Sequence, residues 1–337
     1  MTRTIIIAEA GVNHNGDIRL AKKLVDAAVD AGVDYVKFQT FKASNIVSKQ
    51  AKKAGYQKKN MTNGDDTQLS MLQNLEMDES MHTELIRYCE QKNIKFLSTP
   101  FDLESIELLK RLNIKLGKIP SGEITNLPYL RAMARAFPFI VLSTGMSEME
   151  EIKDAVKVLL DNGTQSKDLI ILHCNTEYPT PMQDVNLLAM NSISNELNIS
   201  VGYSDHTLGI EVPIAAVALG AVMIEKHFTL DKTMVGPDHK ASLDPLELKA
   251  MTHAIRNINL AMGEAVKTAS PSEIKNKESV RKSIIAKHDI KKGDVFSEEN
   301  LTVKRPGYGI NPMKWDEVIG KTAAREFRMD DLIETND

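Results

Sequence analysis

The chain has 337 residues, 42% of them hydrophobic, and a formal net charge of −4. This length predicts one large domain with a small second one, and the slightly acidic balance argues against nucleic-acid binding. Two cysteines without a Cys-x-x-Cys pair exclude a disulfide framework or zinc ribbon and are typical of a cytoplasmic protein. The apolar run near the N-terminus is too short for a signal peptide. The sequence has no run of about 18 apolar residues, so it predicts no membrane span.

Short β-branched or apolar runs recur along the chain, each followed by an amphipathic helical pattern. The predicted strands cover residues 4–9, 35–39, 94–99, 116–120, 139–143, 169–173, 199–203 and 221–226. Helices are predicted over residues 17–31, from about 78, and from Ser147, where Glu150 suggests a capping box. Eight such repeats in roughly 265 residues predict a (β/α)8 TIM barrel. An open doubly wound sheet is the alternative, but no Gly-x-Gly-x-x-Gly follows the first strand.

Two segments depart from a plain barrel. Residues 42–76 are polar and weakly periodic, as in a lid or a disordered segment, and their lysines favour a solvated face over an anion site. After a barrel domain of residues 1–265, residues 266–282 are rich in Ser, Lys, Glu and Asn and predict a linker. Residues 283–337 then predict a small, mostly β domain. Because so small a core is marginal alone, we expect this domain to dock on another surface.

Polar or ionisable side chains follow almost every predicted strand, at the end of a barrel where function collects. Glu9 and Glu123 are candidates for acid–base work if burial raises their pKa; alternatively, they pair with Lys37 or Lys118 or bind a substrate hydroxyl. The ammonium group of Lys118, together with serine hydroxyls, would suit a phosphate monoester, although serines at such positions also cap helices. These serines are Ser121, Ser143 and Ser204.

Two histidines, His206 and His227, stand where apolar runs give way to polar residues. They are one βα unit apart, so parallel strands would bring both imidazoles to the same end of the barrel. Neutral imidazoles suit Mn, Fe, Co, Ni or Zn and leave positions for water and substrate oxygens. The alternative is a pair of hydrogen-bonded core histidines. Asp205 and Asp238 are candidates for further ligands.

Seven ordered motifs resemble those of the bacterial sialic acid synthase family, at residues 8–16, 37–40, 98–101, 118–123, 142–146, 202–207 and 225–228. Residues 291–306 are similar to that family's antifreeze-like (SAF, β-clip) domain, so the resemblance covers essentially the whole chain. It implies a TIM barrel followed by an antifreeze-like domain. It also implies a transferase-type synthase that condenses phosphoenolpyruvate with an N-acylated mannose-type sugar and releases phosphate.

The resemblance also implies roles for single residues. His206 and His227 match two metal ligands, with Mn2+ expected and Mg2+ or Co2+ as alternatives. Contacts with phosphoenolpyruvate are implied for Thr99, Lys118, Ser121, Ser143 and Ser204. Places near the sugar are implied for Glu9, Gln39, Asn63, Glu123, Tyr178 and Asp238. The residues for which we predict a catalytic role are Glu9, Glu123 and Lys118. Arg305 matches an arginine that reaches into the partner's site, which implies a domain-swapped homodimer.

The stretch after the sixth strand looks like the branch of the family that makes N,N′-diacetyllegionaminate from 2,4-diacetamido-2,4,6-trideoxymannose. The family's asparagine contact with phosphoenolpyruvate falls on Thr176, whose role is left open. Phe38 stands where neuraminate synthases often have histidine, and a ring beside the sugar would suit a less hydroxylated substrate. Three alternatives are an N-acetylneuraminate synthase acting on N-acetylmannosamine, a Schiff-base aldolase using Lys118 or Lys226, and a non-catalytic binding protein.

Overall fold

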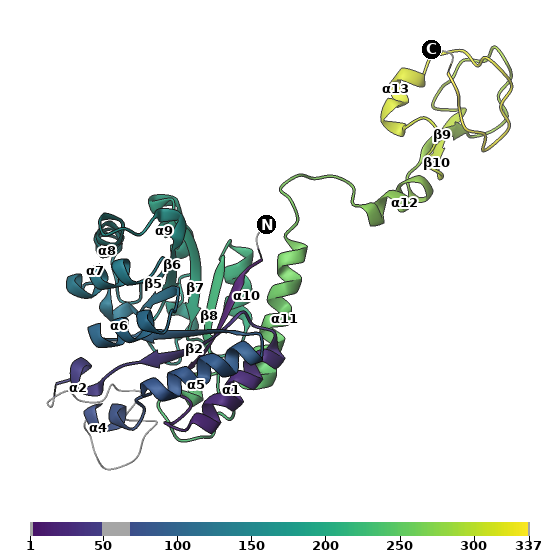
Figure 1. The fold of residues 1–337 in the computed structure, drawn as a ribbon. Coiled ribbons are helices and arrows are strands. Elements are labelled where there is room, and N and C mark those ends of the chain that lie inside the picture. The colour runs from purple at the N-terminus through teal and green to yellow at the C-terminus, as the bar shows by residue number, and fades with distance from the viewer. Residues whose placement is uncertain (1–2, 49–67, 336–337) are drawn as a thin grey trace. The chain divides into compact units, whose positions relative to one another are not determined.

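The structure is a computed structural model that describes residues 3–48 and 68–335. The chain forms two compact units, Met1–Gly263 and Glu264–Asp337 (Figure 1). The division between them falls two residues before the predicted boundary. Asn63 and the lysines of the predicted polar segment at positions 49–59 lie outside the described residues.

The first unit is built on an eight-stranded parallel sheet. Its strands are β1 Ile5–Gly11, β2 Tyr35–Thr40, β3 Lys95–Pro100, β4 Leu116–Ile119, β5 Phe139–Ser143, β6 Leu169–Cys174, β7 Ser200–Asp205 and β8 Met223–His227. They pair in the order β3-β2-β1-β8-β7-β6-β5-β4, and β3 and β4, at the two ends of this order, contact each other. The sheet therefore forms a nearly closed barrel, which confirms the predicted TIM architecture.

Helices surround the barrel (Figure 1). They are α1 Ile18–Ala31, α2 Ala43–Ile46, α4 Gln68–Gln73, α5 Glu79–Gln91, α6 Leu103–Arg111, α7 Leu127–Ala136, α8 Met149–Asp161, α9 Leu188–Leu197, α10 Glu211–Ala218 and α11 Pro245–Ala261. Short 3-10 turns are η1 Ser121–Glu123, η2 Ser166–Asp168, η3 Met182–Asp184 and η4 His239–Ala241. No helix among the residues described is long and apolar enough to cross a membrane.

Local sequence sets the helix ends. Asp17 caps α1 by accepting a hydrogen bond from the Arg19 backbone N–H, and Gly32 ends the helix in the left-handed conformation. The capping box of α8 is formed by Glu148 and Glu151, so the prediction of Ser147 and Glu150 was wrong by one residue. The reason is that a carboxylate can cap an N-terminus as well as a hydroxyl can.

The alternation of side chains along each strand determines which residues form the polar end of the barrel interior. Side chains two residues apart face the same way, and the inward faces begin with an apolar layer of Ile7, Leu97, Val141, Leu172 and Met223. Two residues further along, the same strands carry Glu9, Thr99, Ser143, Cys174 and Glu225. The apolar layer fills the barrel interior toward the amino ends of the strands. The polar layer lies nearer their carboxyl ends and faces a cavity.

Gly202 in β7 is a tight point inside the barrel. A Cβ atom there would lie 2.3 Å from the Met223 carbonyl oxygen and 2.7 Å from Leu172 Cδ2. We expect Gly202→Ala to destabilise the barrel by about 1–3 kcal/mol, because backbone of β8 has to move. Thermal and urea denaturation measure the loss. Gly122→Ala is the control, since a Cβ at Gly122 meets nothing within 4 Å; equal stability of the two variants would contradict the prediction.

The second unit contains α12 Pro271–Val280, β9 Ser283–Ala286, β10 Leu301–Lys304, η5 Pro312–Lys314 and α13 Trp315–Val318. Strands β9 and β10 pair antiparallel over a small core that includes Phe296 and Phe327. The segment predicted as a linker thus contains α12. Its C-terminal end is held to the β unit, because the backbone N–H of Gly307 donates to the Glu278 carbonyl at 2.7 Å. Because α12 has no buried residue, its sequence has no amphipathic pattern from which the helix could be predicted.

Candidate active site

A cavity of about 440 Å³ opens at the carboxyl ends of the barrel strands. Its lining includes all but two of the predicted site residues, namely Glu9, Gln39, Thr99, Lys118, Ser121, Glu123, Ser143, Tyr178, Ser204, His206, His227 and Asp238, together with Thr176. Of the other two, Asn63 lies outside the described residues, and Arg305 belongs to the second unit, where it is exposed and donates from Nε to the Val280 carbonyl. Strand ends far apart in the sequence thus supply one site.

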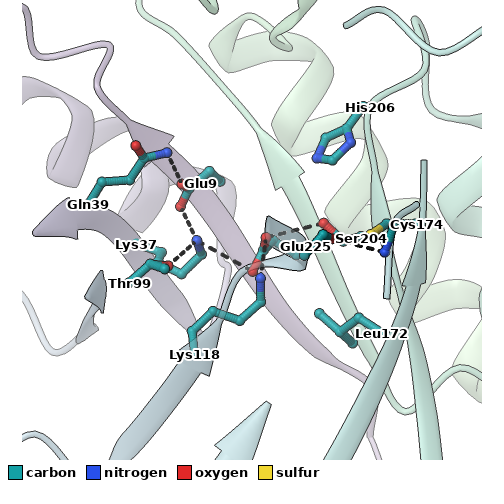
Figure 2. A network of polar contacts seen from close by, with 12 residues as sticks. Glu9, Lys37, Gln39, Thr99, Lys118, Leu172, Cys174, Ser204, His206 and Glu225 are labelled. Atoms are coloured by element: carbon teal, nitrogen blue, oxygen red, sulfur yellow. Dashed lines mark hydrogen bonds and ion pairs between the residues drawn. The ribbon is translucent and has the colours of Figure 1, made fainter. Parts of the chain in front are cut away.

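Four buried charges form a chain across the floor of the cavity (Figure 2). Lys37 Nζ lies 2.9 Å from Glu9 Oε2 and 3.6 Å from Glu225 Oε2, and Lys118 Nζ donates to Glu225 Oε1 at 3.2 Å. None of the four residues is more than 4% exposed. Positive and negative groups alternate, so each carboxylate faces an ammonium group and its burial is compensated.

The surroundings separate the two carboxyl groups in pKa. Burial raises the pKa of Glu9 to about 7, against the opposing effect of Lys37. Burial would also raise the pKa of Glu225, but Lys118 and Lys37 outweigh it and lower that pKa to about 2. Glu225 is therefore a permanent anion, whereas Glu9 exchanges a proton near neutral pH, as an acid–base group needs to do. Burial lowers the pKa of Lys118, against the opposing effect of Glu225. Because Glu9 is partly protonated and Lys37 lies beside both carboxyl groups, the chain can accept an incoming anion.

Several hydroxyl groups line the same cavity as this chain of charges. Thr99 Oγ1 accepts from Lys37 Nζ at 2.8 Å, and Ser204 Oγ donates to Glu225 Oε1 at 3.2 Å. Ser121 Oγ accepts from the Gly145 backbone N–H at 2.9 Å. Ser143 Oγ is buried and has no hydrogen-bond partner among the described residues. A buried hydroxyl without a partner costs free energy, so Ser143 points to a polar ligand in the cavity.

His206 and His227 lie side by side, with ring centroids 5.4 Å apart, and the ring of Tyr178 lies 4.1 Å from that of His206. Burial lowers the pKa of His206 to about 4 and that of His227 well below its ordinary value. Both imidazoles are therefore neutral at pH 7. His206 Nδ1 contacts the Asn175 carbonyl, which can only accept, so Nδ1 carries the proton and Nε2 has a free lone pair, which accepts from the Tyr178 hydroxyl at 3.0 Å.

This pair fits a divalent metal. His227 Nδ1 is buried without a hydrogen-bond partner among the described residues, and Asp238 Oδ2 lies 3.9 Å from it. Within residues 3–48 and 68–335, no group of three or more His, Cys, Asp or Glu side chains forms a ready ligand set. Two neutral imidazoles would leave the other coordination positions to water and substrate oxygens.

The rest of the cavity lining combines polar groups with an apolar wall. Gln39 Nε2 donates to Glu9 Oε1 at 3.2 Å, and burial raises the pKa of Asp238 to about 6. The wall consists of Val12, Phe41, Met71, Leu75 and their neighbours Ile46, Leu72 and Phe101. No local sequence pattern predicts this wall, because its members come from α2, α4 and the segments that follow β1, β2, β3 and α4.

The structure corrects three expectations. Phe38 does not face the cavity; it is fully buried, and its ring stacks on Phe96 with centroids 5.7 Å apart. Because Lys37 and Gln39 face inward, alternation turns Phe38 toward the helices. Glu123 lies partly exposed at the rim, where it accepts from Asn126 Nδ2 at 2.6 Å, so burial distinguishes Glu9 alone. Lys226 is 1% exposed and bound to Asp205 and the Thr207 carbonyl, not facing the cavity as a nucleophile would.

Two cavity residues, Lys37 and Glu225, were missing from the predicted site. The signal that could have found them is the strand period of two. Lys37 precedes Gln39 by two positions on β2, and Glu225 precedes His227 by two on β8, so each had to face the same interior as a predicted site residue.

Comparison with known proteins agrees with this geometry. The model of the NeuB family matches residues 24–267, and that of the SAF domain matches residues 281–337. The chain is 57% identical to an N,N′-diacetyllegionaminic acid synthase of Campylobacter jejuni, over 99% of both chains. It is 48% identical to the enzyme of the same name from Legionella pneumophila, over 94% of this chain and 89% of that one.

A solved structure gives the same picture. The N-acetylneuraminic acid synthetase of Leptospira borgpetersenii, in complex with citrate, superposes with a TM-score of 0.71 at 32% identity, covering 82% of this chain and 90% of that chain. The fold of most of this chain thus recurs in a solved synthase of known type. The chain belongs to the NeuB family, with a C-terminal SAF domain.

Proposed function

We propose that this protein condenses phosphoenolpyruvate with 2,4-diacetamido-2,4,6-trideoxymannose to give N,N′-diacetyllegionaminate and phosphate. The observation that carries the proposal is the cavity itself, in which a buried lysine–carboxylate chain and several hydroxyls, that of Ser143 without a partner among the described residues, adjoin two neutral histidines. The printed name of the Campylobacter relative at 57% identity supports the choice of product.

Phosphoenolpyruvate would occupy the Lys118 side. Its phosphate needs a cation and several donors, which Lys118, Ser121, Ser143 and Ser204 offer around one space. Lys37 anchors Thr99 and holds Glu225 in place from the other side. This arrangement would hold the enol carbon in place, and such positioning can supply a large share of the rate.

The open-chain sugar would lie between the histidine pair and the wall. His206 and His227 would hold the divalent metal, Mn2+ being the first candidate, and a metal in this place supplies Lewis-acid polarisation of a carbonyl oxygen. Asp238, Gln39 and Glu9 line this side and would bind sugar hydroxyl and amide groups.

The bond-forming step joins C3 of phosphoenolpyruvate to the sugar aldehyde carbon, and the aldehyde oxygen takes up a proton. Positive charge that develops at C2 lies near the anion Glu225. Water then adds at C2 with loss of a proton. The C2–O bond to phosphate breaks while the new C2 hydroxyl gives its proton to the departing phosphate, which leaves the 2-keto acid. With a pKa of about 7, Glu9 is the residue to which we assign these proton transfers.

The apolar wall favours the 2,4,6-trideoxy sugar over N-acetylmannosamine. Phe41, Met71 and Leu75 are buried, and they offer no partner for a 6-hydroxyl group. A methyl group at C6 can pack against them, while a hydroxyl would lose its hydrogen bonds with water. N-acetylneuraminate synthesis from N-acetylmannosamine is therefore the second candidate.

The experiment that tests the substrate compares kcat/KM for the two sugars with the metal-reconstituted enzyme and saturating phosphoenolpyruvate, followed by phosphate release. We expect at least a tenfold preference for the 2,4-diacetamido sugar, in line with one unpaired buried hydroxyl. Equal values, or a preference for N-acetylmannosamine, would overturn the choice of sugar while leaving the reaction class intact.

We further propose that the protein works as a domain-swapped homodimer in which Arg305 serves the partner's site. No arginine lines the described part of the cavity, and the Arg305 side chain is exposed in its own unit. Subunit mixing tests this arrangement. Arg305→Ala and Lys118→Met proteins should each be nearly inactive, but a refolded mixture should regain activity through heterodimers with one intact site. A mixture that regains none would contradict the swap.

Ser143 provides a prediction that separates binding from stability. Its hydroxyl is buried without a partner, so Ser143→Ala should not lower Tm. A hydrogen bond to a charged group is worth about 1.5–3 kcal/mol, so the same change should raise the KM for phosphoenolpyruvate by about 10- to 100-fold. Steady-state kinetics and calorimetry check both parts. Ser192→Ala on exposed α9 is the control; an unchanged KM in Ser143→Ala would remove Ser143 from the phosphate site.

A further inference from the structure

The residues directly before the two histidines, Asp205 and Lys226, form an ion pair on the helix-facing side of the barrel. Strands β7 and β8 pair in parallel with Asp205 opposite Lys226, and Lys226 Nζ donates to Asp205 Oδ2. Asp205 is 0% and Lys226 1% exposed. Alternation turns both away from the cavity, so neither touches the space assigned to substrate.

Stability alone does not explain this pair. Burial of two charges costs several kcal/mol each, and well-packed apolar residues often serve as well. The helix-facing positions Ala10 on β1 and Phe38 on β2 are indeed apolar core residues. A charged pair in the same layer therefore calls for a geometric reason.

The contacts of Thr207 supply that reason. Asp205 Oδ1 accepts from the Thr207 backbone N–H at 3.0 Å, and Asp205 Oδ2 accepts from Thr207 Oγ1 at 3.1 Å. Lys226 Nζ donates to the Thr207 carbonyl at 2.6 Å. The backbone on both sides of His206 is thereby tied to the residue that precedes His227.

We propose that Asp205 and Lys226 are positioning residues that fix the separation and orientation of the two imidazoles, and so the affinity of the metal site. The inference rests on the proposed function, because it takes the histidines as the metal ligands. Two ligands alone tolerate little error in their separation, and no third His, Cys, Asp or Glu side chain in the described part of the chain completes a ligand set. Residues that orient metal ligands typically contribute 10- to 100-fold to metal affinity.

The test measures Mn2+ affinity of the full-length apo protein by electron paramagnetic resonance, independently of turnover. Lys226→Met is expected to raise Kd for Mn2+ at least tenfold and to shift the imidazole 15N resonances of His206 in the metal-free protein. The matched control is Arg256→Met, which breaks another ion pair of the same unit, Arg256 Nη2 to Asp34 at 2.7 Å. It should lower Tm and leave Kd within twofold of the wild type.

A second variant serves as the test if loss of the Lys226 charge prevents the protein from folding. Thr207→Val retains both charges but removes the bond from Oγ1 to Asp205, and should raise Kd about threefold or more. The inference is overturned, and the proposed metal site is not, if a folded Lys226→Met protein has wild-type Kd and unshifted imidazole resonances. If Lys226→Met does not fold, the same result for Thr207→Val overturns it. If wild-type and His227→Ala proteins bind Mn2+ equally, the proposed metal site falls and this inference with it.

Discussion

Replacement of Lys118 by methionine is expected to lower kcat/KM for phosphoenolpyruvate by about 10³-fold or more. Lys118 faces Glu225 at 3.2 Å in a pocket where both are less than 5% exposed. The substitution removes the cation assigned to the phosphate and also leaves the Glu225 carboxylate with Lys37 as its one remaining cation. An incoming phosphate then meets net repulsion, and loss of one member of a buried charge pair costs about 3–5 kcal/mol.

Two controls separate this effect from general damage. Lys115→Met changes a lysine just before β4, at the opposite end of the barrel, and should leave kcat/KM unchanged. Lys118→Met combined with Glu225→Gln removes the repelling charge as well, so it should recover part of the loss in KM but not the wild-type rate. A Lys118→Met enzyme within tenfold of wild type would show that phosphate is not bound at this lysine.

The outline of the barrel could be predicted from the sequence because strand length, helix length and repeat number are local properties. The positions of the polar side chains followed for the same reason, since strand ends are visible where an apolar run stops. Thus Glu9, Thr99, Ser143 and His227, read separately from the sequence, line one cavity. Their common location is a consequence of parallel pairing in register.

The direction in which a side chain points was harder to predict than its position along the chain. Phe38 was placed beside the sugar, yet it lies in the helix layer, whereas Lys37 and Glu225 were left out and lie in the cavity. A single position along a strand reverses the side to which a residue points. Applying the period of two from Gln39 on β2 would have corrected Phe38 and Lys37, and from His227 on β8 it would have found Glu225.

Pairing and burial depended on distant parts of the chain. Glu9 could pair with Lys37 or Lys118, and the structure shows that it pairs with Lys37 because β1 and β2 are neighbours. The raised pKa of Glu9 comes from burial under many segments. Glu123 has the same chemistry but stays at the rim. No local pattern separates these two carboxylates.

Replacement of either histidine by alanine is expected to abolish stoichiometric Mn2+ binding and to lower kcat by about 10³-fold or more. Polarisation of a carbonyl by a metal contributes several kcal/mol, and each 1.4 kcal/mol corresponds to a factor of ten in rate. Electron paramagnetic resonance and phosphate release measure the two quantities. His253→Ala, on exposed α11 surface, is the matched histidine control and should change neither. Chelation followed by Mn2+ addition should restore activity in the control alone.

The two histidines should nevertheless differ in stability. His206 accepts from the Tyr178 hydroxyl, contacts the Asn175 carbonyl through Nδ1 and packs against the tyrosine ring. Its loss removes the partner of the partly buried Asn175 carbonyl and should cost about 1–3 kcal/mol. His227 Nδ1 has no hydrogen-bond partner among the described residues, so His227→Ala should cost less in Tm while losing as much turnover. If His227→Ala keeps wild-type turnover after chelation, the imidazole pair serves the fold and the reaction needs no metal here.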